Sequence, residues 1–583
     1  PLSYVSPMIT SELTVTRGVP SVSLAPESIG GHISTQLGRG EFAAAGNDLN
    51  GFVGSRYSAN GNLSTTAGRL VAAGENHKVS LMAEVDDGDD VSTPAGTVLP
   101  SRLHRERSDV SYAYSGAAGS VLLFAGRLDT DDTGTPALPM DIRFIDTALA
   151  GARASFEISD ALQIDARLGW NDVEHLMDNF GLREAPMPMA QRQNFTTGSG
   201  VQLGISGALA LRSSSLEFGV DASNAAHDAT ITNPNNAMFR VDNFVDVERD
   251  VASAFVEWRI DSTRGQFEVG LRAKRITADA GTVSATGMMG GMADLVAELA
   301  ADFNAADRSL SWTSPDAVAK YSYLAASGTE WRLELGHKTR APSYQELSLW
   351  LPLQATGGLA DGRSYIGARQ LDVERSTEIV IGFGRDVGQV ALSPQVYYRR
   401  VNDYIQGVPS SNMTANMVSQ MMSGQPALEF ANVDAEIWGA DIAVRVELAD
   451  HWYLDGIASY VRGKRRDVSD NLYRLAPPNA SIGITRARDG IAVTAELVGY
   501  AEQDNVSVYN AEQATAGYGL VNAMFEWRPG ENLRLEARID NLLDKTYQDY
   551  VAGINRAGGS DIPVGERLYG LERTASVGVI WSF

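Results

Sequence analysis

His175 and Met177 are the two residues whose types and spacing point most directly to chemistry. They lie two positions apart at the end of a segment, beginning at Leu162, in which apolar residues alternate with small or polar ones. This alternation predicts a β-strand that carries His175 and Met177 side by side on its polar face. An imidazole and a thioether facing the same ion favour a soft cation such as Cu(I) over hard cations. The alternative is a methionine that only fills a gap, so the surrounding architecture has to decide.

Two further thioethers follow this strand in the sequence. Met187 and Met189 flank Pro188 in a stretch predicted to be an outer loop. Both sulfurs are expected either to face an approaching ion or to pack beneath the loop. The sequence therefore gives four candidate metal ligands, which are His175, Met177, Met187 and Met189.

Three other patterns are interpreted as structural. Met413, Met417 and Met421 recur at helical spacing, which predicts the buried side of a short loop helix rather than a metal site. The acidic stretches Asp86–Asp90 and Asp129–Asp132 lack the spacing of a calcium loop and are expected to be solvated turns. The remaining histidines are isolated from one another in sequence and predict no site: His32, His77, His104, His227, His337 and His451.

Composition narrows the class of protein. The chain has 583 residues, no cysteine, 57 glycines and a formal net charge of −24. No run of about 18 uncharged apolar residues occurs, so no membrane helix is predicted. The absence of thiols permits passage through an oxidising compartment, where stray cysteines form wrong disulfides. The acidic balance argues against nucleic acid, which binds clustered Lys and Arg, and is compatible with a field that concentrates cations.

Strand periodicity predicts a transmembrane barrel. Strands of about ten residues alternate with connections that are short, then long, as in outer-membrane barrels with tight periplasmic turns and longer outer loops. Leu533–Asp540 alternates apolar with charged residues, which suits lipid on one face and a wet lumen on the other. By this count His175 and Met177 face the lumen at the outer end of their strand. The chain ends in Phe583, which resembles the insertion signal of outer-membrane barrels.

Several segments together resemble the TonB-dependent outer-membrane receptors. These segments are Leu13–Val22 and Glu27–Ile33, similar to the end of the plug domain, and Arg340–Leu347, Asn432–Gly439, Leu475–Pro478 and Asp540–Tyr547, similar to barrel landmarks. The resemblance implies an all-β fold, a 22-stranded antiparallel transmembrane β-barrel with the C-terminal remnant of an N-terminal plug domain. We expect the plug remnant at residues 1–45 and the barrel at residues 46–583.

Within this family the sequence resembles the copper receptors. The similar segments are Pro1–Pro7, His175–Arg183, Met187–Ala190 and Gly553–Gly558. The resemblance implies that the His-x-Met of the barrel is completed by a Cys-x-x-x-Met pair in the plug. That pair would precede Pro1, and this cysteine-free chain would then hold half of a copper site.

The expected function is therefore a receptor and transporter of the bacterial outer membrane, most simply for copper as Cu(I). Its expected partners are outer-membrane lipid, the TonB energising complex, and copper or a copper carrier. A receptor of the same fold for a siderophore or another metal chelate is the first alternative, and a passive or structural porin is the second. No Gly-x-Ser-x-Gly, His-Glu-x-x-His or phosphate-binding Gly-rich motif is present, so the sequence does not predict an enzyme.

Overall fold

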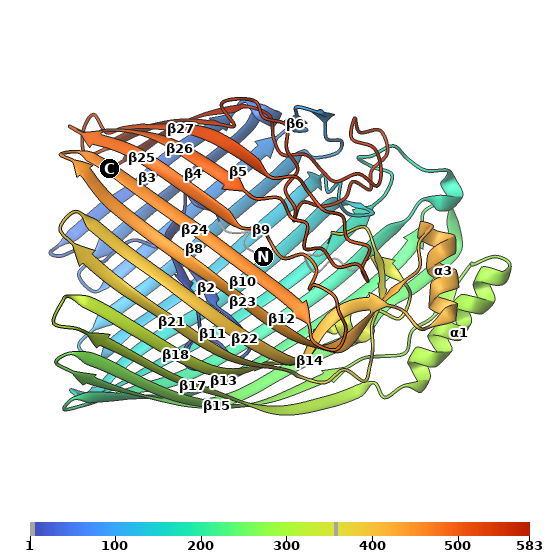
Figure 1. Ribbon diagram of the computed structural model, residues 1–583, viewed down its shortest axis with the longest axis horizontal. Helices are drawn as coiled ribbons and strands as arrows, with labels where there is room; N and C mark the ends of the chain where they lie inside the picture. Colours follow the sequence, from blue (N-terminus) through green and yellow to red (C-terminus); the bar gives the residue numbers. More distant parts are fainter. Residues whose placement is uncertain (1–5, 355–359) are drawn as a thin grey trace.

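The computed structural model describes residues 6–354 and 360–583. Within these residues, 22 antiparallel strands close into one barrel, which confirms the predicted fold class (Figure 1). The barrel strands are β3 (Asn47–Ser58), β4 (Leu63–Gly74), β5 (His77–Gly88), β8 (Leu103–Gly116), β9 (Gly119–Thr133), β10 (Asp141–Ser159), β11 (Leu162–Asp178), β12 (Gln193–Leu211), β13 (Ser214–Asn233), β14 (Asn236–Ser262), β15 (Gly265–Asp279), β17 (Ser309–Leu324), β18 (Thr329–Arg340), β21 (Glu374–Val387), β22 (Val390–Pro409), β23 (Leu428–Ala449), β24 (Trp452–Arg465), β25 (Asn479–Arg488), β26 (Ile491–Tyr500), β27 (Tyr518–Trp527), β28 (Leu533–Asp540) and β29 (Thr574–Ser582). The Pro1–Val5 part of the copper-receptor resemblance lies outside the described residues.

The remaining elements are short and lie in the lumen or in the connections. They are β1 (Thr10–Thr16), β2 (His32–Leu37), β6 (Ser92–Thr93), β7 (Gly96–Thr97), β16 (Ala285–Thr286), β19 (Leu353–Gln354), β20 (Ser364–Ile366), the α-helices α1 (Gly291–Ala305), α2 (Tyr344–Ser348) and α3 (Met413–Ser423), and the 3-10 turns η2 (Asn60–Asn62) and η3 (Pro188–Ala190). No helix of the described residues is long and apolar enough to cross a membrane.

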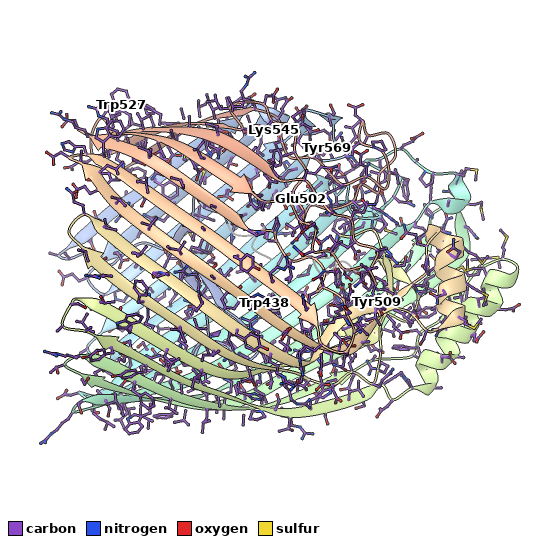
Figure 2. All side chains as sticks on the ribbon, in the orientation of Figure 1. Trp438, Glu502, Tyr509, Trp527, Lys545 and Tyr569 are labelled. Atoms are coloured by element: carbon purple, nitrogen blue, oxygen red, sulfur yellow. The ribbon has the colours of Figure 1, made fainter. Side chains whose placement is uncertain are left out.

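The two ends of the barrel differ. One end carries tight turns, and the other carries the long connections together with α1 and α3 (Figure 1). We call them the turn end and the loop end. Trp527, the last residue of β27, lies at the turn end (Figure 2) and is 41% exposed. Exposed aromatic residues at a barrel rim are typical of the interface between lipid and water.

The strands alternate between an outer apolar face and a polar lumen face. On β29, Val577 is 57% and Val579 is 42% exposed, and both point outward. On the two strands that flank β29, Arg56 of β3 and Glu536 of β28 form an ion pair on the lumen face. This alternation is the pattern of a sheet with lipid outside and water inside.

Several strands run past the ends that the sequence predicts. β5 continues to Gly88 and β9 to Thr133, so the interpretation as solvated turns is wrong for residues 86–88 and for all of Asp129–Asp132. Asp86 is buried on the lumen face, where Arg105 of β8 pairs with it. The carboxylates are compatible with strand structure because cross-strand partners of opposite charge stabilise the extended ends.

Residues 6–40 cross the lumen and contact its wall. Val19 and Val22 are fully buried against barrel side chains. Each valine lies above a barrel glycine, because an added Cβ would come within 2.6 Å of Val19 at Gly336 and within 2.5 Å of Val22 at Gly270. The absence of these two side chains makes room for the inner segment.

We expect tolerance of charge to follow the face of the strand. Val577→Lys places an ammonium group on the outer face and should destabilise the barrel by about 2–4 kcal/mol if the position lies near mid-bilayer. Ser576→Lys is the matched control, because Ser576 is next to Val577 on β29 and faces the lumen. Urea titration in vesicles and heat-modifiable gel mobility measure the effect. Equal losses for the two variants would contradict the assignment of the faces.

Candidate metal site at the loop end

His175 and Met177 face the lumen at the loop end of β11. Leu168 and Trp170 of the same strand point outward and are 48% and 44% exposed, whereas Arg167 forms an ion pair on the inner side with Asp221 of β13. β11 pairs with β12 without interruption from Leu162 to Asp178. The alternation therefore continues to the end of the strand, and odd-numbered residues face inward.

The neighbouring strands complete the surroundings of the pair. His175 lies opposite Thr196 of β12, and Met177 lies opposite Asn194. Nε2 of His175 and Oδ1 of Asn194 are both buried and have no hydrogen-bond partner among the described residues. Two unsatisfied buried polar atoms on adjacent strands carry a free-energy cost, which a bound ion would remove.

Met187 and Met189 lie in the loop between β11 and β12 and are 78% and 52% exposed. Pro188 begins the 3-10 turn η3 between them. The side-chain amide of Asn233, at the end of β13, donates to the carbonyls of Pro188 and Met189 at 3.1 Å each. The loop is thus anchored while both thioethers remain open to solvent, so packing beneath the loop does not occur.

A buried ion pair fixes the start of this loop. Arg183 donates to both carboxylate oxygens of Asp141, at 2.7 and 2.6 Å, and the two side chains are 4% and 0% exposed. Arg183 also donates to the carbonyl of Leu138 at 3.0 Å. A bidentate pair of this kind fixes both distance and orientation, so the path of the chain after β11 is well defined.

His227 is a neighbour of the site that the sequence analysis missed. It lies on β13 opposite Gly198 of β12, and its ring packs against Tyr344 and Phe244 at centroid distances of 4.6 and 5.2 Å. The alternation of β13 could have placed His227 on the lumen face. Val220 is 52% exposed on the outer face, so the odd-numbered residues of this strand face the lumen. No pattern in the sequence, however, indicates the strand register that brings His227 close to His175.

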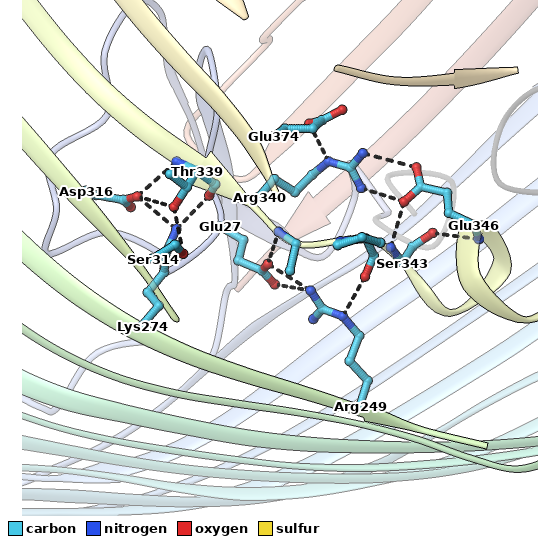
Figure 3. A network of polar contacts seen from close by, with 12 residues as sticks. Glu27, Arg249, Lys274, Ser314, Asp316, Thr339, Arg340, Ser343, Glu346 and Glu374 are labelled. Carbon is cyan, nitrogen blue, oxygen red and sulfur yellow. Dashed lines mark hydrogen bonds and ion pairs between the residues drawn. The ribbon is translucent and has the colours of Figure 1, made fainter. Parts of the chain in front are cut away.

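A polar network connects the inner segment to α2 (Figure 3). Glu27 accepts two hydrogen bonds from Arg249 of β14 at 2.8 Å and one from the backbone N–H of Ala341 at 3.0 Å. Ser343 and Glu346 form a capping box at the start of α2. The first residue of this helix, Tyr344, is the one that packs on His227.

The methionines of α3 are exposed, so the prediction that they form the buried side of the helix is wrong. The predicted helix is present, but Met413, Met417 and Met421 are 76%, 46% and 61% exposed. The buried side consists instead of smaller residues, which are Thr414, Ala415, Val418 and Ser419. These small side chains allow α3 to pack closely on its neighbours, and the methionines are left on the solvent side.

The donor set limits which ions the site suits. Among the described residues, no three His, Cys, Asp or Glu side chains gather closely enough to hold a metal ion. A site at the loop end therefore depends on thioether and amide groups in addition to imidazole. Such a set is soft or borderline in character and does not suit Mg²⁺ or Ca²⁺.

Comparisons with known proteins give the family. Residues 84–542 match the family described as TonB dependent receptor-like, beta-barrel. No curated protein matches the chain.

Solved structures show the same fold at low sequence identity. The copper transporter OprC superimposes with a TM-score of 0.85 at 21% identity, over 100% of this chain and 87% of that one. The FrpB iron transporter from Neisseria meningitidis gives 0.71 at 12% identity, over 99% and 88% of the two chains. The ferric yersiniabactin uptake receptor FyuA from Yersinia pestis gives 0.69 at 13%, over 98% and 85%.

The family match spans most of the chain, and its members are non-enzymatic transporters. In such barrels the short turns face the periplasm and the long loops face outward. The chain therefore belongs to the TonB-dependent receptor-like β-barrel family and is a transporter of the bacterial outer membrane, not the passive porin that its sequence left open.

Proposed function

We propose that this transporter binds and imports copper, captured as Cu(I) by His175 and Met177. The observation that carries the proposal is the unsatisfied Nε2 of His175, buried on the lumen face beside the Met177 thioether. Imidazole and thioether ligands suit Cu(I). The similarity in fold to a copper transporter supports this choice of metal.

Met187 and Met189 recruit the ion before it reaches this pair. Their exposure at the loop end places two soft ligands where an ion arrives from outside. A few thioethers bind reversibly, which suits a site that has to pass its ion onward. Met187→Leu combined with Met189→Leu should slow uptake at low copper and leave the affinity of the inner pair unchanged.

Residues 1–45 form the C-terminal part of the plug, and residues 46–583 form the barrel. Supporting contacts are the burial of Val19 and Val22 in the lumen and the Glu27–Arg249 ion pair. Displacement of the plug by the TonB complex would have to break these contacts. The further copper ligands that the resemblance implies would belong to the same plug.

A receptor for a metal chelate is the second candidate. A cavity of about 510 Å³ lies at the loop end between α1 and the loops that follow β18 and β22. Arg369, Phe303 and Glu429 line it. A guanidinium beside an aromatic wall suits an organic anion, and the fold is shared with a ferric yersiniabactin receptor.

Silver and ferric-chelate titrations of the protein produced from its complete gene distinguish the two candidates. We expect saturable binding of Ag⁺, a redox-stable substitute for Cu(I), in calorimetry under chloride-free conditions. Copper accumulation by cells should also depend on both this protein and TonB. Binding of a ferric chelate without binding of Ag⁺ would refute the copper proposal and support the chelate receptor.

A further inference from the structure

A group of basic side chains lies on the outer wall of the barrel, toward the loop end. Tyr397 of β22 packs in the lumen against the valines of the inner segment, so Arg400, three residues later, faces outward. The strand register sets Glu436 of β23 opposite Arg400, and Lys464 of β24 opposite Glu436. Arg462 lies on the same face of β24, two residues before Lys464. We call Arg400, Arg462 and Lys464 the basic patch.

The side chains of the basic patch have no partner. Among the described residues, none of the three forms a side-chain hydrogen bond or an ion pair. Glu436, the carboxylate between them, accepts a hydrogen bond from the hydroxyl of Tyr398 at 3.0 Å. The positive charge of the patch contrasts with the formal net charge of −24 of the whole chain. Unpaired cations gathered on the surface of an acidic protein indicate an anionic partner.

The spacing along β24 places the basic patch at the edge of the membrane. Trp452 begins this strand at the turn end and is 42% exposed, and Arg462 follows ten residues later. At about 3.4 Å per residue and a tilt of about 40°, ten residues rise about 26 Å, which matches an apolar band about 25 Å tall. Trp438 lies opposite Arg462, on the wall that faces the viewer in Figure 2. An aromatic residue at this height is typical of the interface, so the patch lies among the headgroups of the outer leaflet.

An apolar hollow lies next to the basic patch, on the lipid-facing wall between β22 and β26. Its volume is about 700 Å³. Val396, Ala440 and Tyr460 form one row of its lining, and this row lies two residues closer to the turn end than the row of Arg462. Ala458 and Ala480 continue the lining below this row. The hollow is deep because these alanines are small, whereas Val396 and Tyr460 at its side project outward.

We propose that the basic patch and the hollow together bind one lipid of the outer leaflet that carries phosphate on its headgroup. Arg400, Arg462 and Lys464 bind the phosphate oxygens. An acyl chain of the same lipid lies in the hollow over Ala440 and Ala458, where burial of its methylene groups adds to the affinity. Headgroup and chain can be held together because patch and hollow are only two residues apart along β24. The site lies on the opposite face of the wall from the lumen and does not depend on the proposed metal.

A second hollow of the outer wall provides a comparison. It has a volume of about 530 Å³ and is lined by small residues that include Ala252, Ala254 and Ala273. Arg275 lies at its edge, opposite Ala252, and the carboxylate of Asp250 lies two residues along the same neighbouring strand. A cation beside a carboxylate is already partly neutralised, so we expect no selective binding of a phosphorylated lipid here.

The test measures binding of lipid A with two phosphate groups to the protein produced from its complete gene, in detergent, by native mass spectrometry. Lipid A without phosphate and inorganic phosphate are the comparison ligands. The patch variant combines Arg400→Gln with Lys464→Gln, and Arg275→Gln is its control at the second hollow. Ala458→Phe fills the proposed acyl site, and Ala254→Phe is its control. Heat-modifiable gel mobility checks that every barrel is folded.

The patch variant should bind lipid A at least about tenfold more weakly, because each basic residue near an anionic lipid surface contributes about fivefold. Ala458→Phe should weaken binding by about tenfold, which corresponds to the displacement of about two methylene groups. Both controls should bind as the wild type does. Wild-type affinity in either test variant, or equal binding of lipid A with and without phosphate, would overturn the proposal. Displacement of lipid A by millimolar inorganic phosphate would also overturn it, because the patch would then be a site for free anions.

Discussion

Replacing His175 and Met177 together by alanine should weaken Ag⁺ binding by at least about a hundredfold. Loss of a residue that only hydrogen-bonds a metal ligand already costs about 10–100-fold in affinity, and here two ligands are lost. The fold should survive the change. Both residues lie at the end of β11 on the lumen face, and the buried, unpaired Nε2 of His175 costs stability, so its removal does not destabilise the strand. Calorimetric titration of the protein from its complete gene measures the affinity, and circular dichroism measures the strand content.

Asn171→Ala provides the matched control for the double variant. Asn171 lies on the same strand and faces the lumen, where its Oδ1 lies 2.8 Å from the Cβ position of Gly200. This variant should bind Ag⁺ as the wild type does. If the double variant keeps wild-type affinity, the site lies elsewhere, and the loop that holds Met187 and Met189 becomes the better candidate.

Arg183→Met should loosen the loop after β11 by about 3–5 kcal/mol, the usual cost of leaving a buried charge without its partner. The change leaves the Asp141 carboxylate, which is 0% exposed, without a charged partner; Thr135 still donates to it from its backbone N–H at 2.9 Å and from its hydroxyl at 3.5 Å. Hydrogen exchange of residues 134–141 and 179–186, followed by mass spectrometry, measures the free energy of local opening. Metal recruitment by this loop should slow in parallel.

A second substitution separates charge from packing in this prediction. Asp141→Asn in the Arg183→Met background removes the unpaired charge and should recover most of the lost protection, because replacing both partners of a polar pair is far less costly than replacing one. Equal exchange in the single and double variants would mean that the ion pair does not hold the loop.

The faces of the strands were predictable, because the inward or outward position of each side chain follows from the alternation of apolar and polar residues along the chain. Leu168 and Trp170 point outward and Arg167 inward, which is what their order in the sequence predicts. The same alternation placed His175 and Met177 on the lumen face. The division at residues 45 and 46, and the metal ligands themselves, stay predictions.

What the sequence could not provide is the meeting of residues that are far apart in the chain. β14 has 27 residues, far beyond the expected ten, because its extension pairs with β13 and β16 at the loop end. The position of His227 opposite Gly198 depends on the register between β12 and β13, which no residue pattern specifies. The exposure of Met413 was mispredicted for a related reason, since helical spacing identifies a stripe but not the surface that covers it.

Closure of the barrel has a consequence for how the protein is made. β3 pairs with β29, and at this seam Asn60 donates a hydrogen bond to Thr574, 514 residues later. Until residues 574–582 have been synthesised, β3 has one edge without a partner, and open edges invite pairing with other chains. Contacts at such a separation also form slowly. The barrel therefore cannot close before its last strand has been made, and until then the nascent polypeptide is exposed to pairing with other chains.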